Sequence, residues 1–267
     1  MNTYLLYING EWKENFDGRI AANVDPATGK PFAQVHMAGE KDVDAAIGAA
    51  SKAFAHWSQT LPPERESVLQ KAADALEDMR EEAVALMIAE SGSTWRKANA
   101  ELTGSIGVLR VAAGECRRIG SEVYAPKATG NFSFSYRVPL GVILGIAPFN
   151  YPMILAIKKL AYAIAAGDTF VLKPATDTPL SGLIIAKAFK KAGLPAGVLN
   201  VVPCAGSLME KFLVDERIKA ITFTGSSSVG KKIAAIAANG LKKYTMELGG
   251  KNPMIVLSDY NVDHAVH

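Results

Sequence analysis

From Gly141 onward, short apolar runs alternate with helical segments, and this alternation restricts the chain to very few folds. Helices are expected at 154–166, 179–192, 208–214 and 229–238. The expected strands are GVILGIA (141–147), TFVLKPA (169–175), VLNVV (198–202), AITFTG (220–225), YTMELGG (244–250) and PMIVL (253–257). Strands that are apolar throughout are buried on both faces, which is typical of a parallel sheet between two layers of helices. We therefore predict a doubly wound α/β fold.

The first 120 residues follow other patterns. Asn9-Gly10 is a two-residue hairpin signal, and 25–30 (DPATGK) contains a second turn. From Glu40 the apolar residues recur at helical spacing, and further helices are expected at 64–91 and 97–120. We predict that 1–120 contributes strands and a helical layer to the same domain.

A third pattern occupies residues 121–140. Between 121 and 137 apolar and polar residues alternate, with Phe132, Phe134 and Tyr136 on one side and a turn at Gly130-Asn131. Such alternation predicts a half-exposed pair of strands. We therefore divide the chain into 1–120, a hairpin at 121–140 and a sheet core at 141–267.

Charge and cysteine content exclude several classes of function. The chain has 29 basic and 26 acidic side chains, a net charge of +3, without the clustered lysines and arginines of a nucleic-acid-binding surface. Its two cysteines, Cys116 and Cys204, are far apart in the sequence and have no histidine cluster nearby. We expect neither a disulfide framework nor a metal site, and the composition favours a reducing, cytoplasmic location.

One uncharged stretch is long enough to span a membrane. Residues 138–157 carry no charge, but Pro139, Pro148 and Pro152 interrupt them. The pattern indicates a buried strand, a turn and the start of a helix instead. The N-terminus lacks a basic segment followed by a long apolar run, so we predict neither a signal peptide nor a membrane segment.

Polar residues at the strand ends are the candidates for a site, because ligands bind at the carboxyl ends of strands in such sheets. The loop 223–230 (FTGSSSVG) opens a helix, and its free N–H groups could hold an anion. Lys173, at another strand end, could bind a ribose hydroxyl or a phosphate. The alternatives are a serine-rich turn without a ligand and an exposed strand-end lysine.

Two more strand ends carry side chains suited to catalysis. Asn150 lies in a loop bounded by Pro148 and Pro152, where its amide could donate to a developing oxyanion. Glu247 precedes two glycines, and a buried carboxylate there could act as a general base. Taken alone, Asn150 is more typical of a side chain that bonds its own turn, and Glu247 could be a surface residue.

The joint order of these segments is far more specific than any one of them. PFNYP, LKPA, FTGSSSVG and MELGGKNP follow one another as they do in aldehyde dehydrogenases, and YINGEW and DPATGKP resemble the opening of that family. The resemblance covers essentially the whole chain. It implies a Rossmann-like fold, NAD or NADP as cofactor, oxidation of an aldehyde through a cysteine thioester, and a homo-oligomer in which the hairpin is an arm.

The resemblance also implies roles for individual residues. Asn150 would donate to the oxyanion, Glu247 would activate the deacylating water, and Lys158 would lie close to the active site. Lys173 would hold the adenosine ribose, and Ser226 the pyrophosphate. The other cofactor-binding positions it implies are Ile146, Ala147, Pro148, Phe149, Ala175, Thr176, Gly206, Phe223, Gly225, Val229, Leu248 and Gly249.

The chain departs from the family pattern in three respects. Thr176 stands where many NAD-preferring members have a glutamate that repels the 2′-phosphate, so NADP becomes acceptable. Phe149 stands where tryptophan is common. The turn 204–206 (CAG) replaces a more glycine-rich one and puts the floor of the adenine pocket in doubt.

The end of the chain raises the question of activity. The family's nucleophilic cysteine follows the glutamate at a greater distance than this chain extends, and neither Cys116 nor Cys204 matches it. A helix that begins near Asp259 or Asn261 would stop within its first turns, which suggests truncation. We expect the isolated chain to be inactive. The alternatives are a non-catalytic nucleotide-binding or scaffolding chain, and part of an acylating enzyme, which would lack the base.

Overall fold

A computed structural model describes residues 1–266, and its core is a seven-stranded sheet with the strand order β12-β11-β8-β9-β10-β2-β3. Five neighbouring strands are parallel, and two N-terminal strands extend the sheet in antiparallel fashion. The strands are β2 (Leu6–Ile8), β3 (Glu11–Lys13), β8 (Val142–Ile146), β9 (Thr169–Lys173), β10 (Leu199–Val201), β11 (Ile218–Thr224) and β12 (Lys243–Glu247). The predicted doubly wound α/β fold is confirmed.

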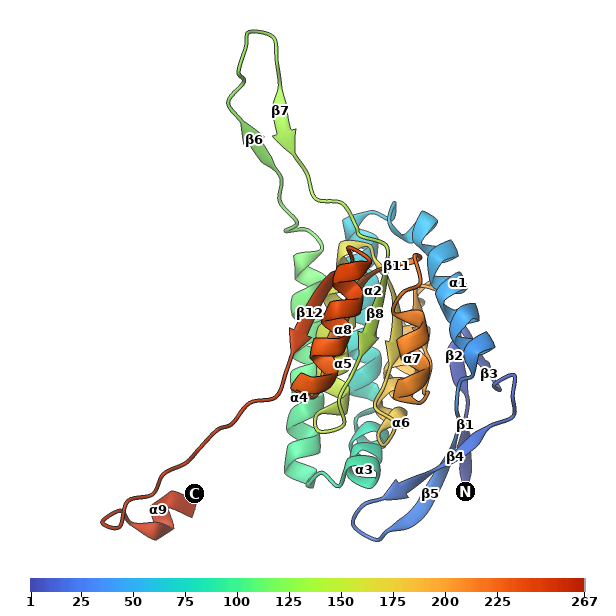
Figure 1. Cartoon of the computed structure of the whole chain (residues 1–267), viewed down its shortest axis with the longest axis vertical. Coiled ribbons are helices and arrows are strands. Elements are labelled where there is room, and N and C mark those ends of the chain that lie inside the picture. The colour runs from blue at the N-terminus through green and yellow to red at the C-terminus, as the bar shows by residue number, and fades with distance from the viewer. Residues whose placement is uncertain (267) are drawn as a thin grey trace.

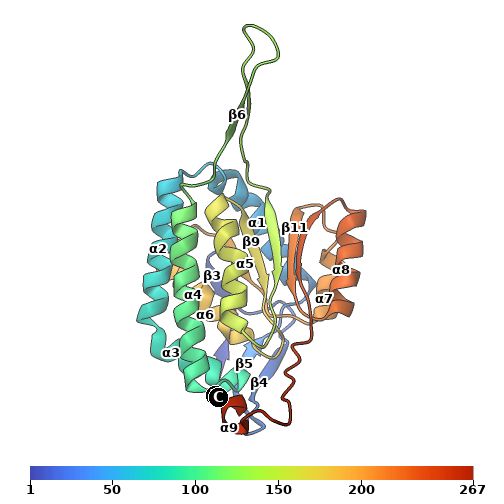
Figure 2. The same ribbon diagram turned by 90° about the vertical axis from the view of Figure 1, so that its left-hand side faces the viewer.

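Helices cover both faces of this sheet (Figures 1 and 2). One face packs against α1 (Glu40–Trp57), α7 (Gly206–Phe212) and α8 (Ser227–Asn239). The other packs against α5 (Pro152–Ala166) and α6 (Pro179–Lys191). Outside these two lies the helical layer α2 (Pro62–Asp78), α3 (Arg80–Ser91) and α4 (Trp95–Glu115).

The strand order reverses between β8 and β11. The chain builds β8, β9 and β10 in one direction and then crosses to the other side of β8 to add β11 and β12. Such a reversal opens a crevice beyond the carboxyl ends of the two strands at which it occurs, and ligands bind there in doubly wound folds. The topology therefore places the candidate site at the end of β8 and β11.

The turn signals of the N-terminal region are confirmed. Asn9 and Gly10 both have positive φ, 53° and 79°, as the two-residue turn between β2 and β3 requires. The turn at 25–30 joins β4 (Ile20–Asp25) to β5 (Lys30–His36). These two strands form a small separate sheet with β1 (Asn2–Tyr4).

Three predicted elements differ from the structure. The helix expected at 64–91 is two helices, because the backbone turns at Met79 and α3 thereby packs against both α4 and α6. The helix expected at 97–120 ends at Glu115. The predicted strand at 253–257 is wrong, because no strand within residues 1–266 lies beside it to receive its backbone hydrogen bonds. This segment leads away from the body to α9 (Val262–Val266) (Figure 1).

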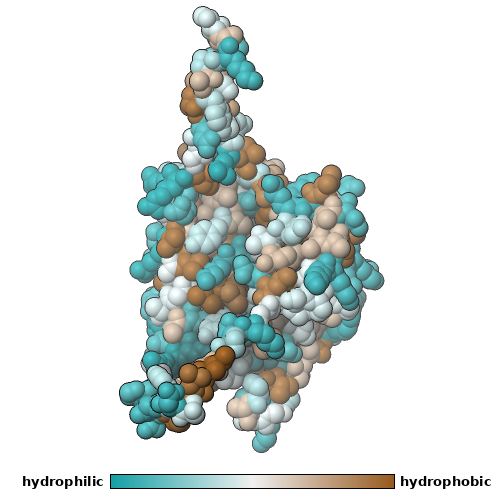
Figure 3. Space-filling model, turned by 60° about the vertical axis from the view of Figure 1, so that its left-hand side comes forward, coloured by the Kyte–Doolittle hydropathy of each residue, from teal (hydrophilic) through white to brown (hydrophobic). Residues whose placement is uncertain are grey.

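The predicted hairpin is present and projects from the domain (Figure 1). It consists of β6 (Glu122–Tyr124) and β7 (Ser133–Ser135), which within residues 1–266 pair only with each other. Phe132 and Phe134 are 74% and 55% exposed, and their ring centroids lie 5.3 Å apart. Tyr136 stacks on Phe134 at 6.2 Å. The alternation thus gives the arm an apolar face, part of which is visible in Figure 3.

Two buried glutamates of the helical layer satisfy the first turns of the helices beneath them. Glu90 of α3 accepts hydrogen bonds from the backbone N–H groups of Leu180 and Ser181, both at 2.8 Å, and from the Ser181 hydroxyl. Glu101 of α4 accepts from the first turn of α5 in the same way. Each carboxylate therefore caps a helix that belongs to another part of the chain.

Burial makes Glu90 sensitive to pH. It raises the pKa of the carboxyl to about 7, although the hydrogen bonds from Ser181, Leu180 and Asn23 oppose the shift. The folded state thus holds this proton more tightly than the unfolded chain does. We predict that the free energy of unfolding falls as the pH rises from about 4.5 to 7, by at most about 3 kcal/mol. Denaturant titrations at several pH values measure this.

The Glu90→Gln variant should lose this part of the pH dependence, and its one amide oxygen can still accept one of the two backbone hydrogen bonds, from Leu180 or from Ser181. Glu115→Gln, at the exposed end of α4, serves as the control. Identical pH profiles for Glu90→Gln and the parent chain would contradict the assignment.

Candidate functional site

The residues expected at the site meet at one edge of the sheet. In the strand registers, Ile146 of β8 lies opposite both Lys173 of β9 and Phe223 of β11, and Thr224 lies opposite Glu247 of β12. Two backbone hydrogen bonds extend the ladder past the strand ends, from Ala147 to Lys173 and from Gly225 to Glu247, at 3.0 and 3.1 Å. The sheet thus brings together segments of the chain that are about a hundred residues apart.

The loop after β8 presents Asn150 to solvent. The side-chain oxygen of Asn150 accepts a hydrogen bond from the Tyr151 N–H at 3.1 Å, as the alternative interpretation expected. Its Nδ2 group has no hydrogen-bond partner among residues 1–266. The turn therefore holds one end of the amide and leaves the other free to donate. Of the neighbouring residues, Phe149 is exposed and Pro148 is half-buried.

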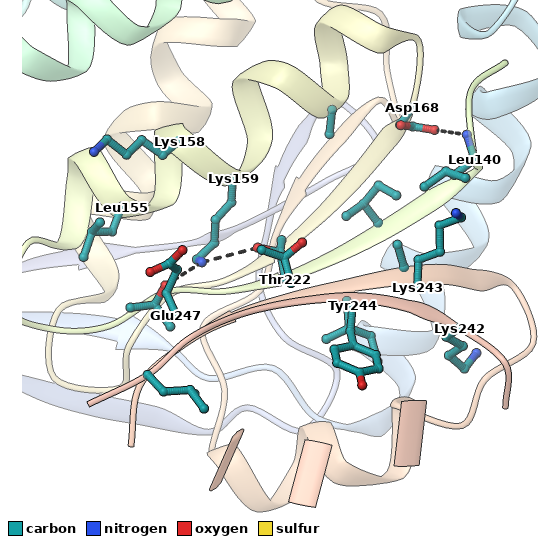
Figure 4. Close-up of a pocket in the computed structure, with 17 residues that line it drawn as sticks. Leu140, Leu155, Lys158, Lys159, Asp168, Thr222, Lys242, Lys243, Tyr244 and Glu247 are labelled. Carbon is teal, nitrogen blue, oxygen red and sulfur yellow. Dashed lines mark hydrogen bonds between the residues drawn. The ribbon is translucent and has the colours of Figure 1, made fainter. Parts of the chain in front are cut away.

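An open hollow of about 950 Å³ lies between α5 and the strands β11 and β12 (Figure 4). The ammonium of Lys159 projects into it and donates to the hydroxyls of Thr224 and Thr222, at 2.6 and 3.3 Å. Burial lowers the pKa of Lys159 to about 8, and the charge of Glu247 opposes this shift. This amine therefore exchanges its proton close to neutral pH.

Lys158 and Glu247 also line this hollow. Lys158 is exposed and projects away from Glu247 (Figure 4). Glu247 is exposed as well, because β12 is the last strand on this side of the sheet. The expectation that Glu247 is buried is therefore wrong, and the alternative, a surface carboxylate, is what the structure contains.

Lys173 lies at the end of β9 and is only 6% exposed. Burial lowers its pKa. Its ammonium is 3.5 Å from the hydroxyl of Thr176, which in turn donates to the backbone oxygen of Cys204 at 3.5 Å. Lys173 is therefore a buried cation beside the uncharged hydroxyl of Thr176. Ala175, which precedes Thr176, is half-buried.

The loop after β11 leads into the N-terminus of α8. A Cβ atom on Gly225 would lie 2.4 Å from the ring of Phe223, so this position requires glycine. Phe223 itself is 5% exposed, and its side chain belongs to the core. Ser226 caps α8 by accepting from the Val229 N–H at 3.4 Å.

The segment after β12 covers the first turn of α8. A Cβ atom on Gly230 would lie 2.3 Å from Leu248 Cδ2, and one on Gly249 would lie 3.8 Å from the Ser227 hydroxyl. Leu248 and Gly249 are thus brought against the first turn of α8. Gly206 lies apart from them, at the start of α7 beyond β10.

The starts of α5, α6 and α8 differ in the side chain that accepts their free N–H groups. The first turns of α5 and α6 receive the carboxylates of Glu101 and Glu90. The first turn of α8 contains no acidic residue and has the neutral Ser226 as its cap. Because a helix N-terminus attracts anions, the start of α8 is the one of these three that can accept a phosphate.

Residues 1–266 contain neither a group of side chains that could bind a metal ion nor a helix that could span a membrane. In that range no three histidine, cysteine or acidic side chains are grouped so that they could hold a metal ion. None of the helices within it is both long and apolar enough to cross a membrane.

Sequence reasoning missed four charged residues that the structure places in or beside the site. They are Lys159, which binds the strand hydroxyls, and Glu90, Lys97 and Glu101 of the helical layer. The alternation of Thr222 and Thr224 on an otherwise apolar strand was an available signal, since both hydroxyls point to one face. The helix caps had no local signal, because each joins segments far apart in the chain.

The environment of Lys159 gives a testable titration. We predict that this amine titrates near pH 8 and that Glu247→Gln moves its pKa below 8, because the variant removes the charge that stabilises the ammonium. NMR of isotopically methylated lysines measures the shift, with Lys159→Met to assign the signal. Glu82→Gln, in an exposed ion pair with Lys187, is the control and should leave the signal unchanged. An upward shift in Glu247→Gln would refute the interpretation.

Comparisons with known proteins agree with the fold and identify the family. A model of the aldehyde dehydrogenase family matches residues 12–267. The vanillin dehydrogenase of Corynebacterium glutamicum is 40% identical over 262 residues, which are 97% of this chain and 54% of that protein. The alpha-ketoglutaric semialdehyde dehydrogenase of Bacillus subtilis is 39% identical over 266 residues, 99% of this chain and 54% of that protein.

Solved structures give the same result. The NAD-dependent benzaldehyde dehydrogenase from Corynebacterium glutamicum superimposes with a TM-score of 0.91 at 39% identity, covering 98% of this chain and 58% of that one. A salicylaldehyde dehydrogenase from Pseudomonas putida G7 complexed with salicylaldehyde gives 0.93 at 33% identity, covering 100% and 56%. The chain spans about half the length of the curated relatives it matches. Over that span, it belongs to the aldehyde dehydrogenase family.

Proposed function

We propose that this chain is the NAD(P)-binding part of an aldehyde dehydrogenase, and that the whole protein oxidises an aldehyde to a carboxylate through a thioester on a cysteine outside the chain. One observation carries the proposal. Four groups lie together at the carboxyl ends of the parallel strands. They are the free amide donor of Asn150, the carboxylate of Glu247, the buried cation of Lys173 and the N-terminus of α8, whose first turn has no acidic residue.

The residues present fit a nicotinamide dinucleotide. The start of α8, with Ser226 and Gly225, would hold the pyrophosphate, and Lys173 with Thr176 would face the ribose on the adenosine side. Leu248 and Gly249 would lie near the nicotinamide, which accepts a hydride when bound. Relatives of solved structure support either cofactor, since one was solved as an NAD+ complex and another is described as an NADP-dependent enzyme. The remaining contacts we propose are those of Ile146, Ala147, Pro148, Phe149, Ala175, Gly206, Phe223 and Val229.

The chain's own residues divide the catalytic work. Asn150 Nδ2 would donate to the aldehyde oxygen as it gains negative charge. Glu247 would take a proton from the water that releases the acyl group. Lys159, which shares the hollow with Glu247, can hold or release a proton near neutral pH. We therefore propose for Lys159 the role near the active site that the family resemblance implied for Lys158.

The alternatives differ in chemistry. An acylating enzyme passes the acyl group to coenzyme A or phosphate and does not need a base for water, so the presence of Glu247 disfavours it. A non-catalytic nucleotide-binding or scaffolding chain would retain the start of α8 but would never turn over. Cys116 and Cys204 are both free and buried, and burial raises the pKa of their thiols to about 11 and about 12. Neither is suited to be the nucleophile, and free thiols support the cytoplasmic location.

The proposal is tested by measuring binding and turnover side by side. We predict that the purified chain binds NAD or NADP in calorimetry and forms no NADH or NADPH with any common aldehyde. The same chain joined to the catalytic half of a relative should turn over. Failure to bind either cofactor would reject the proposal. Turnover by the isolated chain that disappears in Cys116→Ser or Cys204→Ser would reject the expected inactivity.

Thr176 provides a test of cofactor choice. Because this residue has no charge, it does not repel a 2′-phosphate, and NADP should bind at least comparably to NAD. Thr176→Glu should weaken NADP selectively by about 1–3 kcal/mol, the scale of one charged contact. Thr176→Gln, of equal size and without charge, is the control. An equal loss for both cofactors in Thr176→Glu would place Thr176 away from the 2′ position.

The projecting hairpin supports a homo-oligomer. Its strands pair only with each other in the described chain, so one edge and the face of Phe132, Phe134 and Tyr136 meet water. Open edges and exposed apolar faces favour pairing with another chain. We propose that a second copy pairs with this arm, as the family resemblance implies.

Light scattering tests this role of the arm. We predict that the chain self-associates at concentrations well above micromolar, and that Phe132→Lys combined with Phe134→Lys shifts it toward monomer. Phe16→Lys, at a residue equally exposed but distant in the fold, should not. A stable monomer of the unaltered chain would overturn the prediction.

A further inference from the structure

The start of α5 is held by a side chain from α4. These two helices lie side by side (Figure 2), and they approach closely where a Cβ on Gly104 would be 2.8 Å from Ile154 Cδ1. Next to this contact, Glu101 Oε1 accepts the N–H groups of Met153 and Ile154 at 2.9 and 3.2 Å. No side chain of the preceding loop caps α5. The carboxylate of Glu101 therefore replaces a local cap.

The second oxygen of Glu101 is in an unusual position. Its side chain is fully buried, and Oε2 has no hydrogen-bond partner within the described chain. The nearest cation, Lys97 Nζ, is 3.5 Å away, which is an ion pair without a close hydrogen bond. A buried carboxylate oxygen left in this way is costly, so another contact must hold Lys97 back.

Lys97 is held by the loop that carries Asn150. Its ammonium donates to the backbone oxygen of Asn150 at 2.8 Å and to the Ser93 hydroxyl at 2.7 Å, and it lies 4.2 Å from the centre of the Tyr151 ring. One cation thus contacts the loop at two successive residues. The ammonium of Lys97 therefore lies closer to Ser93 and to the loop than to the carboxylate of Glu101.

Without these contacts the loop has few attachments. Phe149, Asn150 and Tyr151 are all exposed, and the Asn150 side-chain oxygen bonds only the next N–H. Lys97 fixes the backbone carbonyl of Asn150, and Glu101 fixes the helix that begins two residues later. Together they hold the backbone at and after the residue that carries the free Nδ2 group.

We infer that Lys97 and Glu101 of α4 are positioning residues for Asn150, setting the direction of its amide from outside the sheet. This inference rests on the role proposed for Asn150 as the donor to the oxyanion. Neither side chain needs to touch substrate or cofactor. Their effect is to restrict the loop to one conformation before the aldehyde arrives.

The first experiment measures loop order in the 267-residue chain. Hydrogen exchange resolved by NMR is compared for Lys97→Met, Glu101→Ala and Glu101→Gln, with Glu115→Gln of the same helix as the matched control. Exchange at Met153 and Ile154 should accelerate about tenfold in Glu101→Ala, the size of one lost cap, while Glu101→Gln keeps an acceptor and largely restores protection. Lys97→Met should change the Asn150 side-chain amide signals, and exchange in β8 should stay unchanged.

Unchanged exchange at Met153 and Ile154 in Glu101→Ala would overturn the inference. So would Asn150 signals in Lys97→Met that match those of the parent chain. Accelerated exchange throughout β8 would do so as well, because it would show general destabilisation instead of local positioning.

The second experiment uses the chain joined to a catalytic half and separates this inference from the proposed function. Asn150→Ala should lower kcat by about a hundredfold. Lys97→Met should lower kcat by about tenfold and leave KM for the cofactor unchanged, with Lys97→Arg restoring most of the activity. If Asn150→Ala retains full kcat, the proposed role of Asn150 fails. If Asn150→Ala is impaired and Lys97→Met is not, the positioning role fails.

Discussion

The capping of α5 and α6 by Glu101 and Glu90 is the interaction on which the rest of the structure depends. In a parallel sheet every strand is followed by a crossover helix, and each such helix begins with N–H groups that have no partner inside it. Here the partners come from α3 and α4, which precede the parallel strands in the chain. The helical layer therefore fixes the points at which α5 and α6 start, and with them the strand-end loops in front of these two helices.

This interaction also decides where negative charge can bind. A sheet of this topology offers several helix N-termini close to one edge, and each attracts an anion. Carboxylates of the protein occupy two of them, and a neutral hydroxyl caps α8. A dinucleotide phosphate placed at α5 or α6 would have to displace a carboxyl group that already accepts the N–H groups of the first turn. The protein thus directs its ligand by filling the competing sites as well as by leaving one open.

Local patterns predicted the sheet well, because fully apolar strands and helical spacing are properties of short segments. The strands from β8 to β12 and the residues at their ends were found where the sequence indicated. The strand at 253–257 was predicted wrongly for the same reason, since its composition suits a strand but strand formation requires a neighbour. The turn at Met79 was missed because good helix formers continue through it.

The pair Lys158 and Lys159 shows how little separates a surface residue from a site residue. Consecutive positions on a helix differ by about 100° in direction, so Lys158, which the resemblance named, and its neighbour Lys159 face different surroundings. Packing decides it: Lys159 reaches Thr222 and Thr224, and Lys158 faces solvent. Residues that act through tertiary contacts, such as Lys97 and Glu101, have no sequence signal of this kind at all.

The exposure of the hollow between α5 and β12 determines how its charges behave. Lys159 is only partly buried there and Glu247 is exposed, so water screens their attraction. Anything that covered the hollow would remove this water. Further burial would lower the pKa of Lys159, whereas the unscreened attraction to Glu247 would raise it. Because the two effects oppose each other, the pKa of Lys159 depends on the surface that covers the hollow as well as on the strands and the helix that form it.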